Sequence, residues 1–140
     1  MQNAYVLISP CKDEAKYLER NLKSIEAQTV KPAQWVIVDD GSSDDGMEIV
    51  ARYQERMPFI KVIRRDSGAR AVGGGVVRAF EDGLAAVDVD YDFLCKFDVD
   101  LAMPPRYFEI MLARMAADPL LAAKLWQRSA EMVGLDAELM

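Results

Sequence analysis

The chain has 140 residues, 51% of them hydrophobic, and a net charge of −6 from 17 basic and 23 acidic residues. This size and composition suit one globular domain with a real core, and the acidic balance argues against a protein that binds nucleic acid by neutralising phosphates. There are no histidines and two cysteines, which excludes a Ser-His or Cys-His catalytic pair and a Cys/His zinc site and argues against a disulfide framework. Without a signal peptide or the roughly 20-residue apolar run of a membrane-spanning helix, we expect a cytoplasmic protein.

Short apolar runs alternate with amphipathic segments along the whole chain. Runs rich in β-forming residues predict buried strands, and apolar residues at helical spacing predict helices. In chain order the expected elements are a strand at 4–9, a helix at 12–28, a strand at 35–40, a helix at 47–57, a strand at 59–65, a glycine-rich loop at 66–75, a helix at 76–87, a strand at 91–98, a helix at 104–118 and a helical tail at 120–140. This order indicates an α/β fold, with a Rossmann-like, mostly parallel sheet and helices on both faces.

Ligands of such sheets bind beyond the carboxyl ends of the strands. That rule brings together four polar segments, each of which follows a predicted strand. They are residues 10–14, 39–43, 66–75 and 98–100. We therefore expect the functional site at this edge of the sheet.

Asp98 and Asp100 lie one residue apart after the fourth predicted strand. Side chains two positions apart on an extended segment face the same side. Mg²⁺ and Mn²⁺ take carboxylate oxygens and keep substrate phosphate oxygens in their shell, so a divalent cation would offset the repulsion between these carboxylates. The alternative is that both aspartates only form a turn and a helix cap.

Two other strand ends carry candidate ligand-binding residues. Asp39 or Asp40 could accept a hydrogen bond from a nucleobase, and Ser42 follows them in a loop rich in hydroxyl and amide donors. Ordinary turn chemistry also explains Asp, Gly and Ser here. Pro10 stiffens the turn after the first strand, and Glu14 lies where a carboxylate suits a helix N-terminus, which is an adequate explanation by itself.

The glycine-rich loop precedes a predicted helix and contains or adjoins two arginines. Backbone amides there could approach an anion, with Arg70 or Arg78 pairing with phosphate. The spacing fits neither the dinucleotide fingerprint nor the P-loop. The alternative is that the glycines serve flexibility alone.

Taken together, these motifs resemble the family 2 glycosyltransferases, which have the GT-A fold. The resemblance rests on "VLISPCKDEAKYLERNLKSIEAQT", "VIVDDGSSDDG" and "KFDVDLAMPPRYFEIMLARMAADP". It covers the family's nucleotide-binding half, about residues 4–119. We accordingly expect a nucleotide-sugar-binding domain at 1–119 and a helical tail at 120–140 that departs from the family.

The resemblance implies a nucleoside diphosphate sugar as donor, UDP- or GDP-linked, and Mn²⁺ or Mg²⁺ as cofactor. Pro10 and Glu14 would line the base and ribose pocket, with Lys12 where the family often has a stacking aromatic residue. Asp39 or Asp40 would accept from the base. Ser42, Arg70 and Arg78 complete the expected nucleotide site; Asp98 would face ribose and metal, and Asp100 would ligate the metal.

The resemblance also implies inverting transfer of a sugar to an acceptor hydroxyl, with a carboxylate as general base. In the family a second half carries the acceptor site and that base, and no residue here is marked as the base. The alternative is therefore an inactive nucleotide-binding or scaffold module. A phosphotransferase using D-x-D as nucleophile is a weaker third hypothesis, because that motif belongs on a first strand. Peripheral membrane association and a second copy of the chain are further candidate partners; no nucleic acid is expected.

Overall fold

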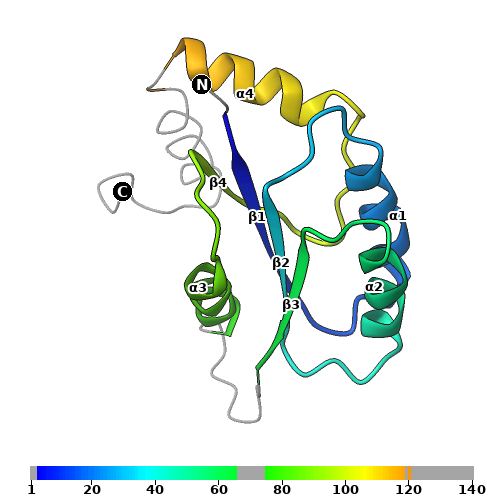
Figure 1. Ribbon diagram of the computed structural model, residues 1–140. Coiled ribbons are helices and arrows are strands. Elements are labelled where there is room, and N and C mark those ends of the chain that lie inside the picture. The colour runs from blue at the N-terminus through cyan, green and yellow to red at the C-terminus, as the bar shows by residue number, and fades with distance from the viewer. Residues whose placement is uncertain (1–2, 66–74, 119, 121–140) are drawn as a thin grey trace, which may run out of the picture.

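The computed structural model describes residues 3–65, 75–118 and 120 and contains one parallel sheet with strand order β3-β2-β1-β4 (Figure 1). This confirms the expected α/β architecture. The elements are β1 (Tyr5–Cys11), α1 (Ala15–Glu26), β2 (Gln34–Asp39), α2 (Gly46–Gln54), β3 (Ile60–Arg64), α3 (Gly75–Ala86), β4 (Phe93–Lys96) and α4 (Tyr107–Ala117).

The register of the sheet decides which residues meet at its carboxyl edge. β1 lies between β2 and β4, with Cys11 opposite Asp39 and Ile8 opposite Lys96. β4 therefore ends three residues before β1 does. The chain continues beside the end of β1, because the Phe97 amide donates to the Ile8 carbonyl at 2.9 Å. Residues 98–100 leave the sheet next to the end of β1.

Each face of the sheet has its own apolar cluster. Leu7, Trp35 and Ile37 belong to the cluster that also contains buried residues of α1, α2 and α4. Ile8 and Val38, which point to the opposite face, cluster with Ala79 of α3. Helices therefore cover both faces, as expected, with α1 and α2 on the side opposite α3 (Figure 1).

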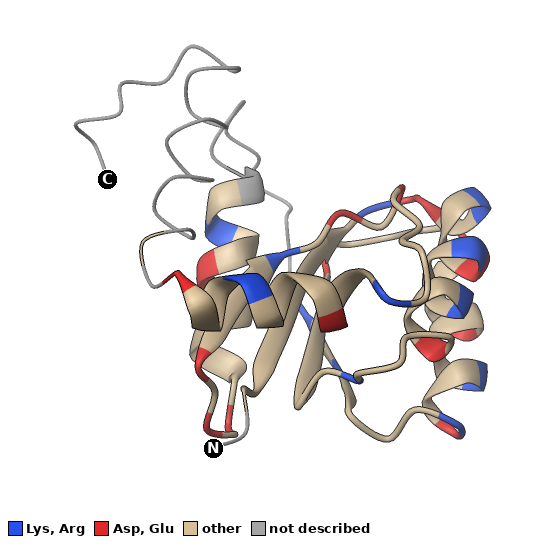
Figure 2. Cartoon of the chain, turned by 90° about the horizontal axis from the view of Figure 1, so that it is seen from above, with Lys and Arg blue, Asp and Glu red and all other residues tan. Residues whose placement is uncertain are grey.

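The outer surfaces of α1 and α2 carry charges of both signs (Figure 2). Two ion pairs reach α1 from α2 and from the residues just after it: Arg52 pairs with Glu19 at 3.9 Å and Arg56 with Glu26 at 2.6 Å. These pairs are largely exposed, so each contributes little to stability. Among the described helices, none has the length and apolar character needed to span a bilayer.

Some element bounds differ from the expected ones. The first helix begins at Ala15 rather than at residue 12, because Asp13 has a φ of 52° and cannot continue a right-handed helix. The first strand runs on to Cys11, whose carbonyl accepts from the Asp40 amide at 2.9 Å. Residues 66–74 of the glycine-rich loop, residue 119 and residues 121–140 lie outside the described residues, so the helical tail and the boundary at residue 119 stay predictions.

Candidate functional site

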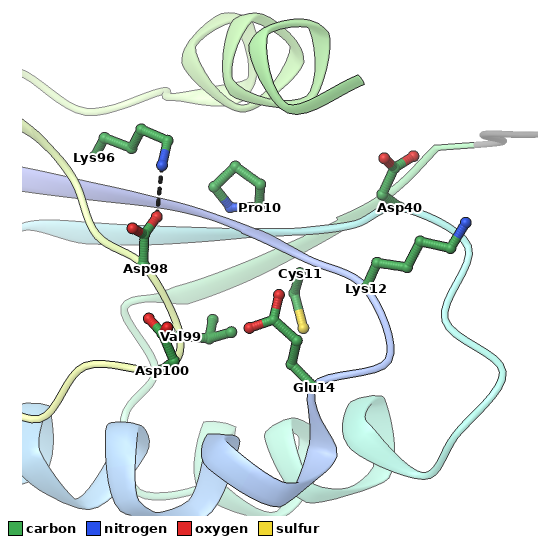
Figure 3. A pocket seen from close by; sticks show the side chains of 9 residues that line it. All are labelled: Pro10, Cys11, Lys12, Glu14, Asp40, Lys96, Asp98, Val99 and Asp100. Carbon is green, nitrogen blue, oxygen red and sulfur yellow. Dashed lines mark hydrogen bonds and ion pairs between the residues drawn. The ribbon is translucent and has the colours of Figure 1, made fainter. Parts of the chain in front are cut away.

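A pocket of about 350 Å³ lies at the carboxyl edge of β1, β2 and β4 (Figure 3). Its volume is within the range of small-molecule sites in proteins. Its place agrees with the rule that open parallel sheets bind ligands at this edge. The lining residues are Pro10, Cys11, Lys12, Glu14, Asp40, Lys96, Asp98, Val99 and Asp100.

Three carboxylates approach one another in this pocket. Glu14, at the start of α1, faces Asp98 and Asp100, which follow β4 (Figure 3). Partial burial raises the pKa of Glu14, and the negative charges of Asp100 and then Asp98 raise it further. Such a concentration of negative charge favours the binding of a cation.

Buried hydrogen bonds fix the backbone that leads into the D-x-D turn. The Trp35 indole N–H donates to Ser9 Oγ at 2.8 Å, and the Ser9 hydroxyl donates to the carbonyl of Phe97. All three side chains are buried, so this chain of bonds is shielded from water. It ties the segment after β4 to the two central strands.

Asn21 of α1 holds the other end of the turn. Its side-chain amide donates to the carbonyls of Asp98 at 3.3 Å and Leu101 at 2.8 Å. Two carbonyl acceptors require the NH₂ group to face the turn, and Oδ1 is left buried without a partner among the described residues. An unsatisfied buried acceptor costs about 1–3 kcal/mol. We infer that Asn21 serves to position the two aspartates.

The loops after β1 and β2 are joined to each other. Asp13 Oδ1 accepts from the amides of Ser43 at 2.7 Å and Asp44 at 3.2 Å, and the Asp13 amide donates to Ser42 Oγ at 3.1 Å. The Ser43 amide is the main cause of a lowered pKa at Asp13. Asp44 in turn accepts from the Ala15 amide at 3.0 Å, at the start of α1. These bonds set the position of Glu14 between them.

The two aspartates at the end of β2 differ in surroundings. Asp39 is buried, and its Oδ1 accepts from the Ser42 amide at 2.9 Å. Asp40 lines the pocket and pairs with Arg65 at 3.2 Å, and Arg65 also pairs with Asp82 of α3 at 3.0 Å. Of the two aspartates that the sequence left open as acceptors, Asp40 lines the pocket and Asp39 does not.

The structure brings six of the residues expected from the sequence to one pocket. Asp39, the last residue of β2, and Ser42, in the loop that follows, do not line it. Arg78 is exposed on α3 and does not line the pocket, and Arg70 lies outside the described residues. The six are Pro10, Lys12, Glu14, Asp40, Asp98 and Asp100.

Sequence reasoning missed three residues that shape the site: Lys96, Asn21 and Asp13. Lys96 Nζ lies 2.5 Å from Asp98 Oδ1. A signal existed only for Asn21, because it falls on the apolar face of α1 beside Leu22. A buried amide at such a position needs polar partners.

The donor set of the pocket fits a hard divalent cation only in part. The carboxylate oxygens of Asp98 and Asp100 are suitable ligands for Mg²⁺ or Mn²⁺. Within the described ranges, no group of three or more acidic or cysteine side chains is arranged to hold a metal ion. Further oxygens would have to come from water or from a bound ligand such as a diphosphate.

Comparison with known proteins decides the family. The model of glycosyl transferase family 2 matches residues 6–137. The chain belongs to glycosyltransferase family 2. The resemblance inferred from the sequence motifs is thereby confirmed, and the match includes all the lining residues of the pocket.

Curated relatives of this family 2 chain are much longer than it is. An uncharacterised glycosyltransferase from Nostoc is 35% identical over 79 residues, which is 54% of this chain and 24% of the relative. A cholesterol galactosyltransferase from Borreliella burgdorferi is 26% identical over 106 residues, covering 76% of this chain and 27% of the relative. A poly-beta-1,6-N-acetyl-D-glucosamine synthase from Staphylococcus aureus is 29% identical over 82 residues, covering 57% and 20%. The chain spans about a quarter of the length of these relatives.

Solved glycosyltransferase structures share the fold. Residues 1–349 of Staphylococcus aureus TarS superpose with a TM-score of 0.68 at 22% identity, covering 81% of this chain and 32% of that one. The same protein has been crystallised with UDP and with UDP-GlcNAc. The mannosyltransferase PcManGT from Pyrobaculum calidifontis, in complex with GDP-Man and Mn²⁺, gives 0.57 at 22% identity, covering 76% and 30%. This similarity shows a GT-A-type fold.

Proposed function

We propose that this chain is the donor-binding part of a glycosyltransferase and takes a UDP- or GDP-linked sugar into the pocket at the carboxyl edge of the sheet. The observation that carries the proposal is the meeting of Glu14, Asp98 and Asp100 there, opposite Asp40. Family membership supports it, as do the complexes of structural neighbours with UDP, UDP-GlcNAc and GDP-Man.

Six of the lining residues have a role in this proposal. Asp40 accepts a hydrogen bond from the base, while Pro10, Lys12 and Glu14 line the base and ribose. Asp98 and Asp100 form the D-x-D metal site and hold Mn²⁺ or Mg²⁺. The Mn²⁺ in two neighbouring structures supports a divalent cation. Such an ion would neutralise charge on the departing diphosphate.

A complete glycosyl transfer also needs an acceptor site and a general base, and neither is identified among the described residues. We propose inverting transfer to an acceptor hydroxyl, in keeping with the family resemblance, with the acceptor site and the general base formed by residues other than the described ones. We also propose the cytoplasmic location that the sequence analysis led us to expect. The alternative, an inactive nucleotide-binding module, predicts nucleotide binding without transfer.

Titration calorimetry tests the donor site directly. UDP and GDP are titrated into the purified chain with Mn²⁺, with Mg²⁺ and with EDTA. Heat of binding for one nucleotide that disappears in EDTA is the expected result, because the acidic pocket repels a diphosphate until a cation neutralises it. Absence of binding for both nucleotides in the presence of either metal would overturn the proposal.

Removal of Asp40 should weaken nucleotide binding. We expect Asp40→Ala to reduce the affinity by about 1–3 kcal/mol, because a base N–H loses a charged acceptor. The matched control is Asp45→Ala, which removes a carboxylate from the same loop. Asp45 makes no side-chain capping bond to α2 and does not line the pocket. Equal nucleotide affinities for the two variants in calorimetry would mean that the nucleobase does not bind at Asp40.

A further inference from the structure

Lys96 is the basic residue closest to the D-x-D carboxylates among the pocket-lining side chains. Its Nζ lies 2.5 Å from Asp98 Oδ1, and the dashed line in Figure 3 marks this pair. The other lining lysine, Lys12, points away from Glu14, Asp98 and Asp100 (Figure 3). Lys96 also counteracts part of the charge repulsion that acts on Glu14. Lys96 is therefore the counter-ion of this acidic cluster.

The position of Lys96 follows from the sheet. It is the last residue of β4, opposite Ile8, so its side chain leaves the strand on the face that α3 covers. Asp98 follows two residues later on the same side. Asn21 holds the turn that carries Asp98. The backbone conformation therefore keeps the Asp98 carboxylate near the Lys96 ammonium.

The ion pair between Lys96 and Asp98 can separate, because both side chains are exposed to water. The side chain of Lys96 is 42% exposed and that of Asp98 is 55% exposed. Water screens an ion pair of this kind, so little free energy opposes its separation. A lysine ammonium on a flexible stem is also a movable point charge with several donor directions. Lys96 can leave Asp98 and still reach another anion in the same pocket.

We propose that Lys96 makes cation binding at the D-x-D turn depend on the diphosphate. Without nucleotide, Lys96 occupies Asp98 and opposes a divalent cation through competition for the carboxylate and like-charge repulsion. With a diphosphate in the pocket, Lys96 transfers its hydrogen bond from Asp98 to a phosphate oxygen, where charge-assisted bonds are strong. Cation and nucleotide then bind with positive coupling. This role rests on the proposed donor-binding function.

The test measures two constants for wild type and Lys96→Met, whose side chain keeps an unbranched stem without the charge. Electron paramagnetic resonance gives the affinity for Mn²⁺ alone, and calorimetry gives the affinity for the nucleotide at saturating Mn²⁺. We expect Lys96→Met to bind Mn²⁺ alone about two- to fivefold more tightly, which is the range of an exposed ion pair. We expect it to bind the nucleotide about tenfold more weakly, because a charged hydrogen bond to phosphate is lost. Tighter binding of Mn²⁺ together with weaker binding of the nucleotide distinguishes this role from structural damage, because damage would weaken both affinities.

Two control variants complete the design. Lys23→Met removes the same charge from the exposed last turn of α1, away from the pocket, and should change neither constant. Lys96→Arg retains the charge and should keep both constants near wild type. If wild type shows metal-dependent nucleotide binding but Lys96→Met shifts neither constant, or both in the same direction, the role of Lys96 is wrong and the donor site stands. If wild type binds no nucleotide, the proposed function fails and the role of Lys96 fails with it.

Discussion

Asp100→Ala should abolish metal-dependent nucleotide binding. In the proposed metal site, the D-x-D turn offers the carboxylates of Asp100 and Asp98 to a cation, and Asp98 is already paired with Lys96. Loss of Asp100 leaves the D-x-D turn with one carboxylate, Asp98, which a cation must share with Lys96. Calorimetric titration of UDP or GDP with Mn²⁺ should then give the same weak or absent heat as wild type in EDTA.

The control for this variant is Asp90→Ala, because Asp90 is an exposed aspartate that precedes β4, at the opposite edge of the sheet. It should retain wild-type binding. Asp100→Ala should also fold well: Asp100 is the leading charge that raises the pKa of Glu14, so its removal relieves repulsion at neutral pH. Thermal unfolding no lower than wild type would show that lost binding is not lost structure. Unchanged Mn²⁺-dependent binding would remove Asp100 from the metal site.

The fold could be predicted from the sequence because its strands are continuous apolar runs. Residues such as Val36 and Ile37 are both fully buried although they point to opposite faces, and this is the signature of a parallel sheet covered on both sides. The start of α1 was misplaced because the left-handed conformation of Asp13 is set by contacts with Ser42 and Ser43, about 30 residues away in sequence. Contacts of this range leave no local pattern.

The position of Asp98 and Asp100 in the pocket could be predicted from the sequence, because both follow a strand at a spacing of two residues. Lys96 could not be, since a lysine at a strand end is ordinarily solvated and its pairing with Asp98 depends on a turn held by Asn21. Asp39 shows the limit of motif reasoning, because in the structure its carboxylate serves the loop after β2. Its role toward a nucleotide stays a prediction.

A side chain at Gly83 should destabilise the protein strongly. Gly83 is buried where α3 crosses the sheet, and a Cβ there would lie 2.6 Å from Ile8 Cγ2 and 2.9 Å from Val38 Cγ2. Both neighbours are fully buried in central strands and cannot move aside. We expect Gly83→Val to lower the free energy of unfolding by about 1–3 kcal/mol or more, since α3 must shift outward. Denaturant unfolding followed by circular dichroism measures this difference.

Ala85→Val is the matched control, because it places the same β-branched residue at an exposed position of the same helix. It should cost only the small difference in helix propensity, about 0.5 kcal/mol.

Displacement of α3 would also affect the site: Asp82, next to Gly83, pairs with Arg65, and Arg65 pairs with Asp40. Gly83→Val should therefore weaken nucleotide binding as well, under conditions where it remains folded. Equal losses of stability in the two valine variants would mean that α3 is not seated on the sheet through Gly83.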